Sequence, residues 1–124
     1  QQGLFRVMMI HHPPVAGVVT WRKRLVDGKA VRSILSQYGV ELIIHGHAHK
    51  VSNTQLETKN GSVPVIGVPS ASAKGRKPER RARYNIYRIE QHHTHWQINV
   101  TTWKLSNSYG KCECEVERKI DIRK

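Results

Sequence analysis

Residues 42–49 read Leu-Ile-Ile-His-Gly-His-Ala-His, and the interpretation of the chain starts from them. A short apolar run that ends in polar residues is typical of a buried strand in an α/β sheet. Side chains two positions apart in an extended segment point to the same side, so His47 and His49 are expected to present two imidazoles to one point. Gly46 has no Cβ and allows the backbone to turn tightly beside them.

A second histidine cluster follows a second apolar run. Residues 4–10 are mostly apolar, and residues 11–14 read His-His-Pro-Pro. The intervening residues 22–38 carry apolar side chains at helical spacing, and Gly39 stands where a helix often ends. A strand, a helix and a second strand form a βαβ unit, whose strands are parallel. Both histidine clusters should therefore lie at the same edge of the sheet, where α/β proteins place their ligands.

Two histidine-bearing strand ends at one edge predict a metal site. Neutral imidazoles suit zinc, iron or manganese. A single histidine at a strand end is usually only a polar cap, and His92, His93 and His95 fall in a predicted hairpin turn where solvent exposure explains them. The histidines at 11–12 and 45–49 do not fit that simple explanation, because two clusters are expected to meet.

The remainder of the chain predicts antiparallel strands. Residues 51–58 and 62–68 flank Asn60-Gly61, which is a strong hairpin signal. Residues 84–89 and 95–103 alternate between apolar and polar side chains, so that Trp96, Ile98, Val100 and Thr102 should share one face. We expect residues 1–104 to form the folded portion and residues 105–124 a C-terminal tail or an edge strand.

Composition limits the possible partners. The chain has 124 residues, which corresponds to one domain at most, and 21 basic against 9 acidic side chains give a net charge of +12. This balance favours anionic partners such as phosphorylated metabolites, nucleic acid or an acidic surface. Residues 74–83 hold six basic side chains and one acidic one, a pattern most often found in a solvated loop.

Cysteine usage and the termini suggest cell location and completeness. Cys112 and Cys114 are the only cysteines, and a disulfide between neighbours so close in sequence would be strained. We expect both to be reduced, in a cytoplasmic protein. No run approaches the ~20 apolar residues of a membrane span, and no membrane partner is expected. The first residue is Gln1, and we expect the chain to be a piece of a longer protein.

The order and spacing of the two histidine boxes resemble those of the calcineurin-like metallophosphoesterases, in particular their bacterial phosphodiesterase-like branch. The resemblance covers residues 4–70 and, more loosely, the strands to 103. It implies an α/β fold, namely the C-terminal half of a four-layer αββα sandwich with mixed parallel and antiparallel strands, in which residues 1–104 are the C-terminal portion of the metallophosphoesterase domain. It also implies that His11, His47 and His49 are metal ligands, and that His12 and His45 are second-shell or substrate-facing groups.

The resemblance further implies a metal-dependent phosphoester hydrolase, with two divalent transition-metal ions (Mn, Fe or Zn) in the full-length protein. The family's remaining ligands lie in an Asp-x-His, a Gly-Asp and a Gly-Asn-His box, and none of these boxes occurs in this chain. We therefore expect no catalytic residue here and no activity from the isolated chain. Its expected partners are a phosphorylated small-molecule substrate and the missing N-terminal half of the same protein, without which an apolar face would be uncovered.

Two alternatives remain open. The first is a basic nucleic-acid-binding module, which would combine residues 74–83 with stacking aromatic side chains. The candidates for stacking are Tyr84, Tyr87, Trp96 and Trp103. The second is a degenerate, non-catalytic member of the family that uses its strands for protein contacts. Nucleic acid is the less favoured partner.

Overall fold

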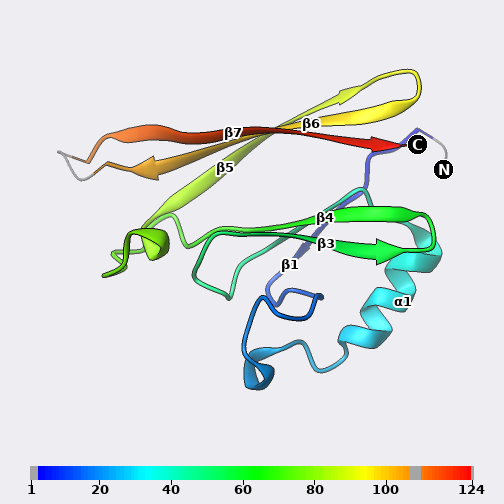
Figure 1. Ribbon diagram of the computed structural model, residues 1–124, viewed down its shortest axis with the longest axis horizontal. Helices are drawn as coiled ribbons and strands as arrows, with labels where there is room; N and C mark the ends of the chain where they lie inside the picture. The colour runs from blue at the N-terminus through cyan, green and yellow to red at the C-terminus, as the bar shows by residue number, and fades with distance from the viewer. Residues whose placement is uncertain (1–2, 107–109, 124) are drawn as a thin grey trace. The chain divides into compact units, whose positions relative to one another are not determined.

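The computed structural model describes residues 3–106 and 110–123 (Figure 1). The chain divides into two compact units, Gln1–Val68 and Pro69–Lys124, which are considered separately below. The boundary between these units lies at a different place from the predicted boundary between residues 1–104 and 105–124, which stays a prediction.

The first unit is built on a four-stranded sheet. Its strands are β1 (Val7–Ile10), β2 (Leu42–His45), β3 (Ser52–Thr58) and β4 (Gly61–Gly67), and their order in the sheet is β1-β2-β4-β3. Strands β1 and β2 are parallel, as are β2 and β4, whereas β3 runs antiparallel to β4. Helix α1 (Gly28–Tyr38) connects β1 to β2. The predicted parallel βαβ unit and the β3–β4 hairpin are thus confirmed.

The helix is shorter than the pattern over residues 22–38 predicted. Trp21–Lys23 form a 3₁₀ turn, η1, and Arg24 is extended, so α1 begins only after Asp27. Gly39 ends it as predicted, with a φ of 82° and its N–H donating to the carbonyl of Leu35.

One arginine ties the start of β1 to both ends of the α1–β2 connection. The side chain of Arg6 donates to the Tyr38 carbonyl at the end of α1 and pairs with the carboxylate of Glu41. The Arg6 N–H also donates to Glu41 Oε2 over 2.6 Å. A cation at a helix C-terminus interacts favourably with the last carbonyls and with the helix dipole. Arg6, the single charged residue in the first apolar run, is therefore paired with both the helix end and Glu41.

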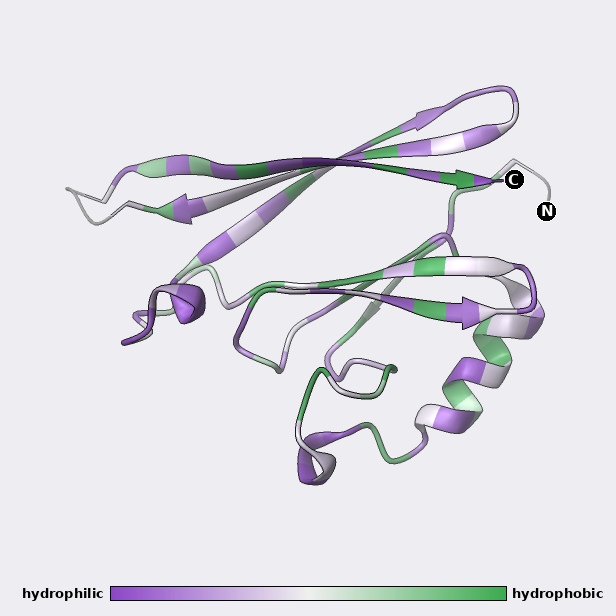
Figure 2. Ribbon diagram, in the orientation of Figure 1, coloured by the Kyte–Doolittle hydropathy of each residue, from purple (hydrophilic) through white to green (hydrophobic). Residues whose placement is uncertain are grey.

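The core of this unit lies between α1 and the sheet. Its buried members come from strands β2, β3 and β4 and from the segment between α1 and β2, and side chains from β1, the following loop and α1 pack against them. The buried members are Val40, Ile43, Leu56, Val63 and Val65, and those packed against them are Met8, Ile10, Val15 and Leu35. Strand β4 is accordingly one of the more hydrophobic segments in Figure 2.

The second unit is a three-stranded antiparallel sheet. Strands β5 (Arg83–Gln91), β6 (His95–Leu105) and β7 (Cys112–Arg123) lie side by side in this order. In β6 the side chains of Ile98, Val100 and Thr102 are buried, with exposed fractions of 0, 0 and 2%. The predicted alternation in this strand is confirmed.

The loop between the sheet of the first unit and β5 is basic and hydrophilic (Figure 2). It contains the 3₁₀ turn η2 (Pro78–Arg80). Most of its charged side chains are exposed, as the charge run predicted, but Arg81 is half-buried and Arg83, the first residue of β5, is buried. Both cysteines are free. None of the described helices is long and apolar enough to span a membrane.

Candidate metal centre

The histidine clusters lie at the same edge of the first sheet because β1 and β2 are parallel. Ile10 pairs with His45 at the last position of the register, so His11 and His12 leave β1 beside the point where His45 ends β2. The loop after β2 then carries His47 towards the chain that follows β1. The backbone of the two strands thus brings the two histidine clusters close together, as the sequence predicted.

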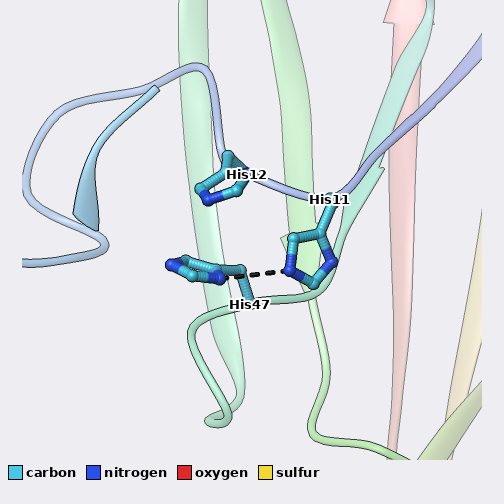
Figure 3. Close-up of side chains that lie close together, drawn as sticks. All are labelled: His11, His12 and His47. Atoms are coloured by element: carbon cyan, nitrogen blue, oxygen red, sulfur yellow. Dashed lines mark hydrogen bonds between the residues drawn. The ribbon is translucent and has the colours of Figure 1, made fainter. Parts of the chain in front are cut away.

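Three imidazoles converge at this edge (Figure 3). His47 Nδ1 lies 3.1 Å from His11 Nε2, and the ring centroids of His12 and His47 are 4.0 Å apart. One ring nitrogen from each of His11, His12 and His47 lies within 4.8 Å of the other two. In a tetrahedral zinc site with bonds of about 2.0–2.1 Å, two ligand nitrogens are about 3.3 Å apart. The His11–His47 distance already fits that geometry, and a nitrogen of His12 lies within 4.8 Å of both.

The two nitrogens of His47 have different surroundings. Nδ1 faces His11 Nε2, the pair whose distance fits a shared cation, whereas Nε2 is buried and has no hydrogen-bond partner. The pKa of His47 is lowered, first by desolvation and then by electrostatic interaction with the neighbouring His12, His11, Lys23 and His49. Its imidazole is thereby kept neutral, which is the form that binds metals. The site fits a divalent transition metal.

His49 does not join this group, because the backbone leaves the extended conformation. His47 and His49 have φ angles of 58° and 50°, and Ala48 N–H donates to the Gly46 carbonyl over 2.6 Å in a tight turn. Left-handed backbone is uncommon for residues other than glycine, and such strain is often found at functional sites. Two residues in this conformation break the alternation that would have aligned the two side chains, and His49 is exposed.

His45 has a different environment from the other histidines of its cluster. It is 6% exposed, its Nδ1 lies 2.9 Å from the Gly46 carbonyl and its Nε2 lies 3.1 Å from Ser52 Oγ. A ring that donates from Nδ1 and accepts at Nε2 satisfies both contacts. Burial lowers the pKa of His45, so the ring is neutral. Gly67 lies against this ring, where a Cβ would collide with it. Both ring nitrogens of His45 are thus engaged in hydrogen bonds to the neighbouring chain.

No family model matches the chain, and no curated protein matches it. Solved structures do. The Vps29 protein of Chaetomium thermophilum aligns over 100% of this chain with a TM-score of 0.50 and 10% identity, and over 99% with the same score and identity in its complex with a cyclic peptide. Vps29 of Entamoeba histolytica, in a structure with Zn²⁺, aligns over 86% with a TM-score of 0.42 and 19% identity.

The chain has a metallophosphoesterase-like fold. The agreement with the Chaetomium structures carries this conclusion together with the mixed parallel and antiparallel strands, and it confirms the predicted fold class. The chain spans 57–59% of the length of the Chaetomium proteins and 51% of the Entamoeba protein.

Within the metallophosphoesterase-like fold, the structure places the five predicted site residues in three environments. His11 and His47 lie together, His45 is held by hydrogen bonds, and His49 is exposed and is not a member of the group. His12, for which the resemblance implied a supporting role, is the third member of the cluster. Its signal in the sequence was its position directly beside His11, but the spacing alone could not distinguish a ligand from a neighbour.

The other histidines and the aromatic side chains form no comparable site in the described part of the chain. His92 and His95 stack with ring centroids 4.7 Å apart in the β5–β6 hairpin. His92 and His93 are exposed as predicted, but His95 is the first residue of β6 and is half-buried, so the prediction of an exposed turn residue was wrong for it. Tyr84 and Trp103 stack on one face of the second sheet, with centroids 6.4 Å apart. The other two candidate stacking residues lie on the opposite face by register, so the four do not form one surface for nucleic acid.

Proposed function

We propose that this chain binds a divalent transition-metal ion through His11, His12 and His47, and that it is the metal-binding C-terminal portion of a metallophosphoesterase-fold protein. The observation that carries the proposal is the convergence of three imidazoles at the edge where β1 and β2 end. In the ligand set that the family resemblance implies, His49 takes the place of His12. The close contacts within the cluster favour His12.

The isolated chain is proposed to be inactive as a hydrolase. Among the residues that the structure describes, no Asp or Glu belongs to the histidine cluster. A two-metal centre holds two cations about 3.5–4 Å apart. Neutral imidazoles supply no negative charge to offset the repulsion at that distance. Any second metal of the full-length protein would therefore need carboxylates from outside this chain.

For the full-length protein we propose phosphoester hydrolysis, with a phosphorylated small molecule as the substrate. A bound cation supplies Lewis-acid stabilisation of a phosphoryl oxygen. The residues of this chain hold and orient that cation: the Gly46–Ala48 turn fixes His47, and the hydrogen-bonded His45 supports the turn.

The missing N-terminal half is the partner proposed for the edge of the first sheet. β1 stands at one end of the strand order, and an edge strand is a template for pairing with another strand. Val7 and Met9 lie on the face of β1 opposite to Met8 and Ile10, which pack against the core, and they are 47 and 81% exposed. The edge position and this exposed apolar face both support contact with further polypeptide at β1.

A second candidate function is a non-catalytic, protein-binding role. A protein of the same fold, Vps29 of Chaetomium thermophilum, has been solved with a bound cyclic peptide. The lack of a carboxylate in the described cluster is compatible with this role, because protein binding requires no second metal. The hydrolase and the protein-binding role both predict that the isolated chain has no hydrolase activity. They differ in the activity that they predict for the full-length protein.

Calorimetric titration with Zn²⁺ tests the proposal. The 124-residue chain should show one site, which His47→Ala should remove, whereas His93→Ala, on the exposed β5–β6 hairpin, should bind as the unaltered chain does. Hydrolysis of a phosphodiester by the pure chain with Mn²⁺ would contradict the claim of inactivity. Activity of the full-length protein that is lost with His47→Ala would favour the hydrolase over the protein-binding role.

A further inference from the structure

An exposed loop between β1 and α1 combines apolar and basic side chains. Residues 20–26 read Thr-Trp-Arg-Lys-Arg-Leu-Val. Trp21 is 72% exposed and Val26 is 92% exposed, which are among the highest values for large apolar side chains in the described chain. The three basic residues between them are exposed as well. Only Leu25 is half-buried, so it anchors the loop while its neighbours face solvent.

Hydrogen bonds and a cation–π contact hold this loop in a defined conformation. The η1 turn is closed by Lys23 N–H donating to the Thr20 carbonyl over 2.9 Å, and the guanidinium of Arg24 lies over the Trp21 ring, 5.1 Å from its centroid. Arg32 Nη1 donates to the Pro14 carbonyl over 2.9 Å and fastens the preceding segment to α1. The exposed tryptophan is thus presented on a fixed turn.

The charged side chains of residues 20–26 are all positive. Residues 20–26 contain three basic and no acidic side chains, and the first acidic residue of the whole chain is Asp27. We propose that residues 20–26 dock the protein on an anionic lipid surface, with Trp21 and Val26 entering the headgroup region and the three basic side chains meeting the lipid phosphates and carboxylates.

Lipid explains the combination better than other anionic partners. Tryptophan with flanking lysine or arginine is the pattern of membrane-interface anchors. A nucleic acid would use the charges and the stacking face of Trp21 but gives no reason for an exposed Val26. The earlier expectation of no membrane partner rested on the lack of a spanning segment, and peripheral docking needs none.

Co-sedimentation with vesicles tests the proposal. The 124-residue chain should bind phosphatidylcholine vesicles that contain phosphatidylserine, bind poorly to phosphatidylcholine alone, and lose binding as salt is raised. Each neutralised basic side chain should weaken binding about five-fold, and therefore the triple change Arg22→Gln, Lys23→Gln and Arg24→Gln about a hundred-fold. Trp21→Ser should weaken it roughly ten-fold. The tryptophan fluorescence of the chain, which also contains Trp96 and Trp103, should shift to the blue on binding, and this shift should be lost in Trp21→Ser.

The matched control removes equal charge elsewhere. Lys74→Gln, Arg76→Gln and Lys77→Gln alter exposed basic residues in the loop before β5, and this variant should retain most of the vesicle binding. Circular dichroism should show that all variants stay folded. Equal losses from the two triple variants, or no effect of Trp21→Ser, would overturn the proposal. So would binding to poly-glutamate that depends on residues 20–26 while vesicles are not bound, because the surface would then be one for acidic protein.

Discussion

Arg83 is the most deeply buried charge described in the second unit, and removing its partner gives a measurable prediction. Arg83 is 7% exposed and donates to both carboxylate oxygens of Glu115, over 2.5 and 2.6 Å, and to the carbonyls of Pro78 and Arg81, over 2.8 and 3.1 Å. It therefore fastens the basic loop to β7 and is not available to an external anion. Glu115→Gln leaves the guanidinium buried without its counter-charge.

The magnitude follows from the burial of the two partners. Breaking a fully buried ion pair costs about 3–5 kcal/mol. Glu115 is 28% exposed, so solvent screens part of the interaction, and the amide oxygen of glutamine still accepts one hydrogen bond. We expect Glu115→Gln to lower the free energy of unfolding by about 2 kcal/mol at neutral pH.

The same pair predicts the pH dependence. Hydrogen bonding to Arg83 lowers the pKa of Glu115 below the ordinary value of 4.5 for a glutamate side chain. A carboxyl group with a lowered folded-state pKa stabilises the protein above its unfolded-state pKa, and this contribution is lost as the pH falls through the folded-state value. Stability of the unaltered chain should thus decrease below about pH 4.5, and the difference from Glu115→Gln should shrink there.

Urea unfolding of both proteins, at neutral pH and at about pH 3, measures this. Glu113→Gln is the matched control, because Glu113 lies on the same strand and pairs with Lys104 on the surface, at 3.3 Å and 53% exposed. Its effect should stay below about 1 kcal/mol. A difference between Glu115→Gln and the unaltered chain that is equally large at both pH values would refute the argument from the ion pair.

Three further predictions concern the first unit. His12→Ala should weaken Zn²⁺ binding at least about ten-fold in calorimetry while His49→Ala leaves it unchanged, and the reverse result would restore His49 as the ligand. Ile43→Ala should lower the free energy of unfolding by about 2–5 kcal/mol, since Ile43 is fully buried in the core, and a loss below 1 kcal/mol in urea titrations would contradict that placement. Gly39→Ala should lower it by at least about 1–2 kcal/mol, because φ is 82° and the new Cβ would meet the Arg6 guanidinium; an unchanged melting temperature would argue against this end of α1.

The elements that local patterns specify could be predicted from the sequence. The apolar runs, the glycine at the end of α1 and the Asn60-Gly61 turn each act over a few residues, and the parallel order of β1 and β2 follows from the helix between them. The start of α1 could not be predicted in this way, because Leu25 and Val26 continue the helical spacing although Val26 is 92% exposed. Spacing describes which residues could face a core and does not say where the core ends.

The metal ligands could not be predicted from spacing either, because they depend on the backbone torsion angles of two residues. The argument for His47 and His49 assumed extended backbone, in which the side-chain direction repeats every two residues. In the structure both residues have positive φ, so their side chains do not follow the two-residue repeat of an extended strand. The turn brings His47 to His11 and His12, whereas His49 is exposed. Gly46 indicated that a turn was possible, but the sequence does not state how many residues take part. The convergence of two strand ends was thus predictable from topology, whereas the identity of the third imidazole depends on a strained turn that only the backbone conformation reveals.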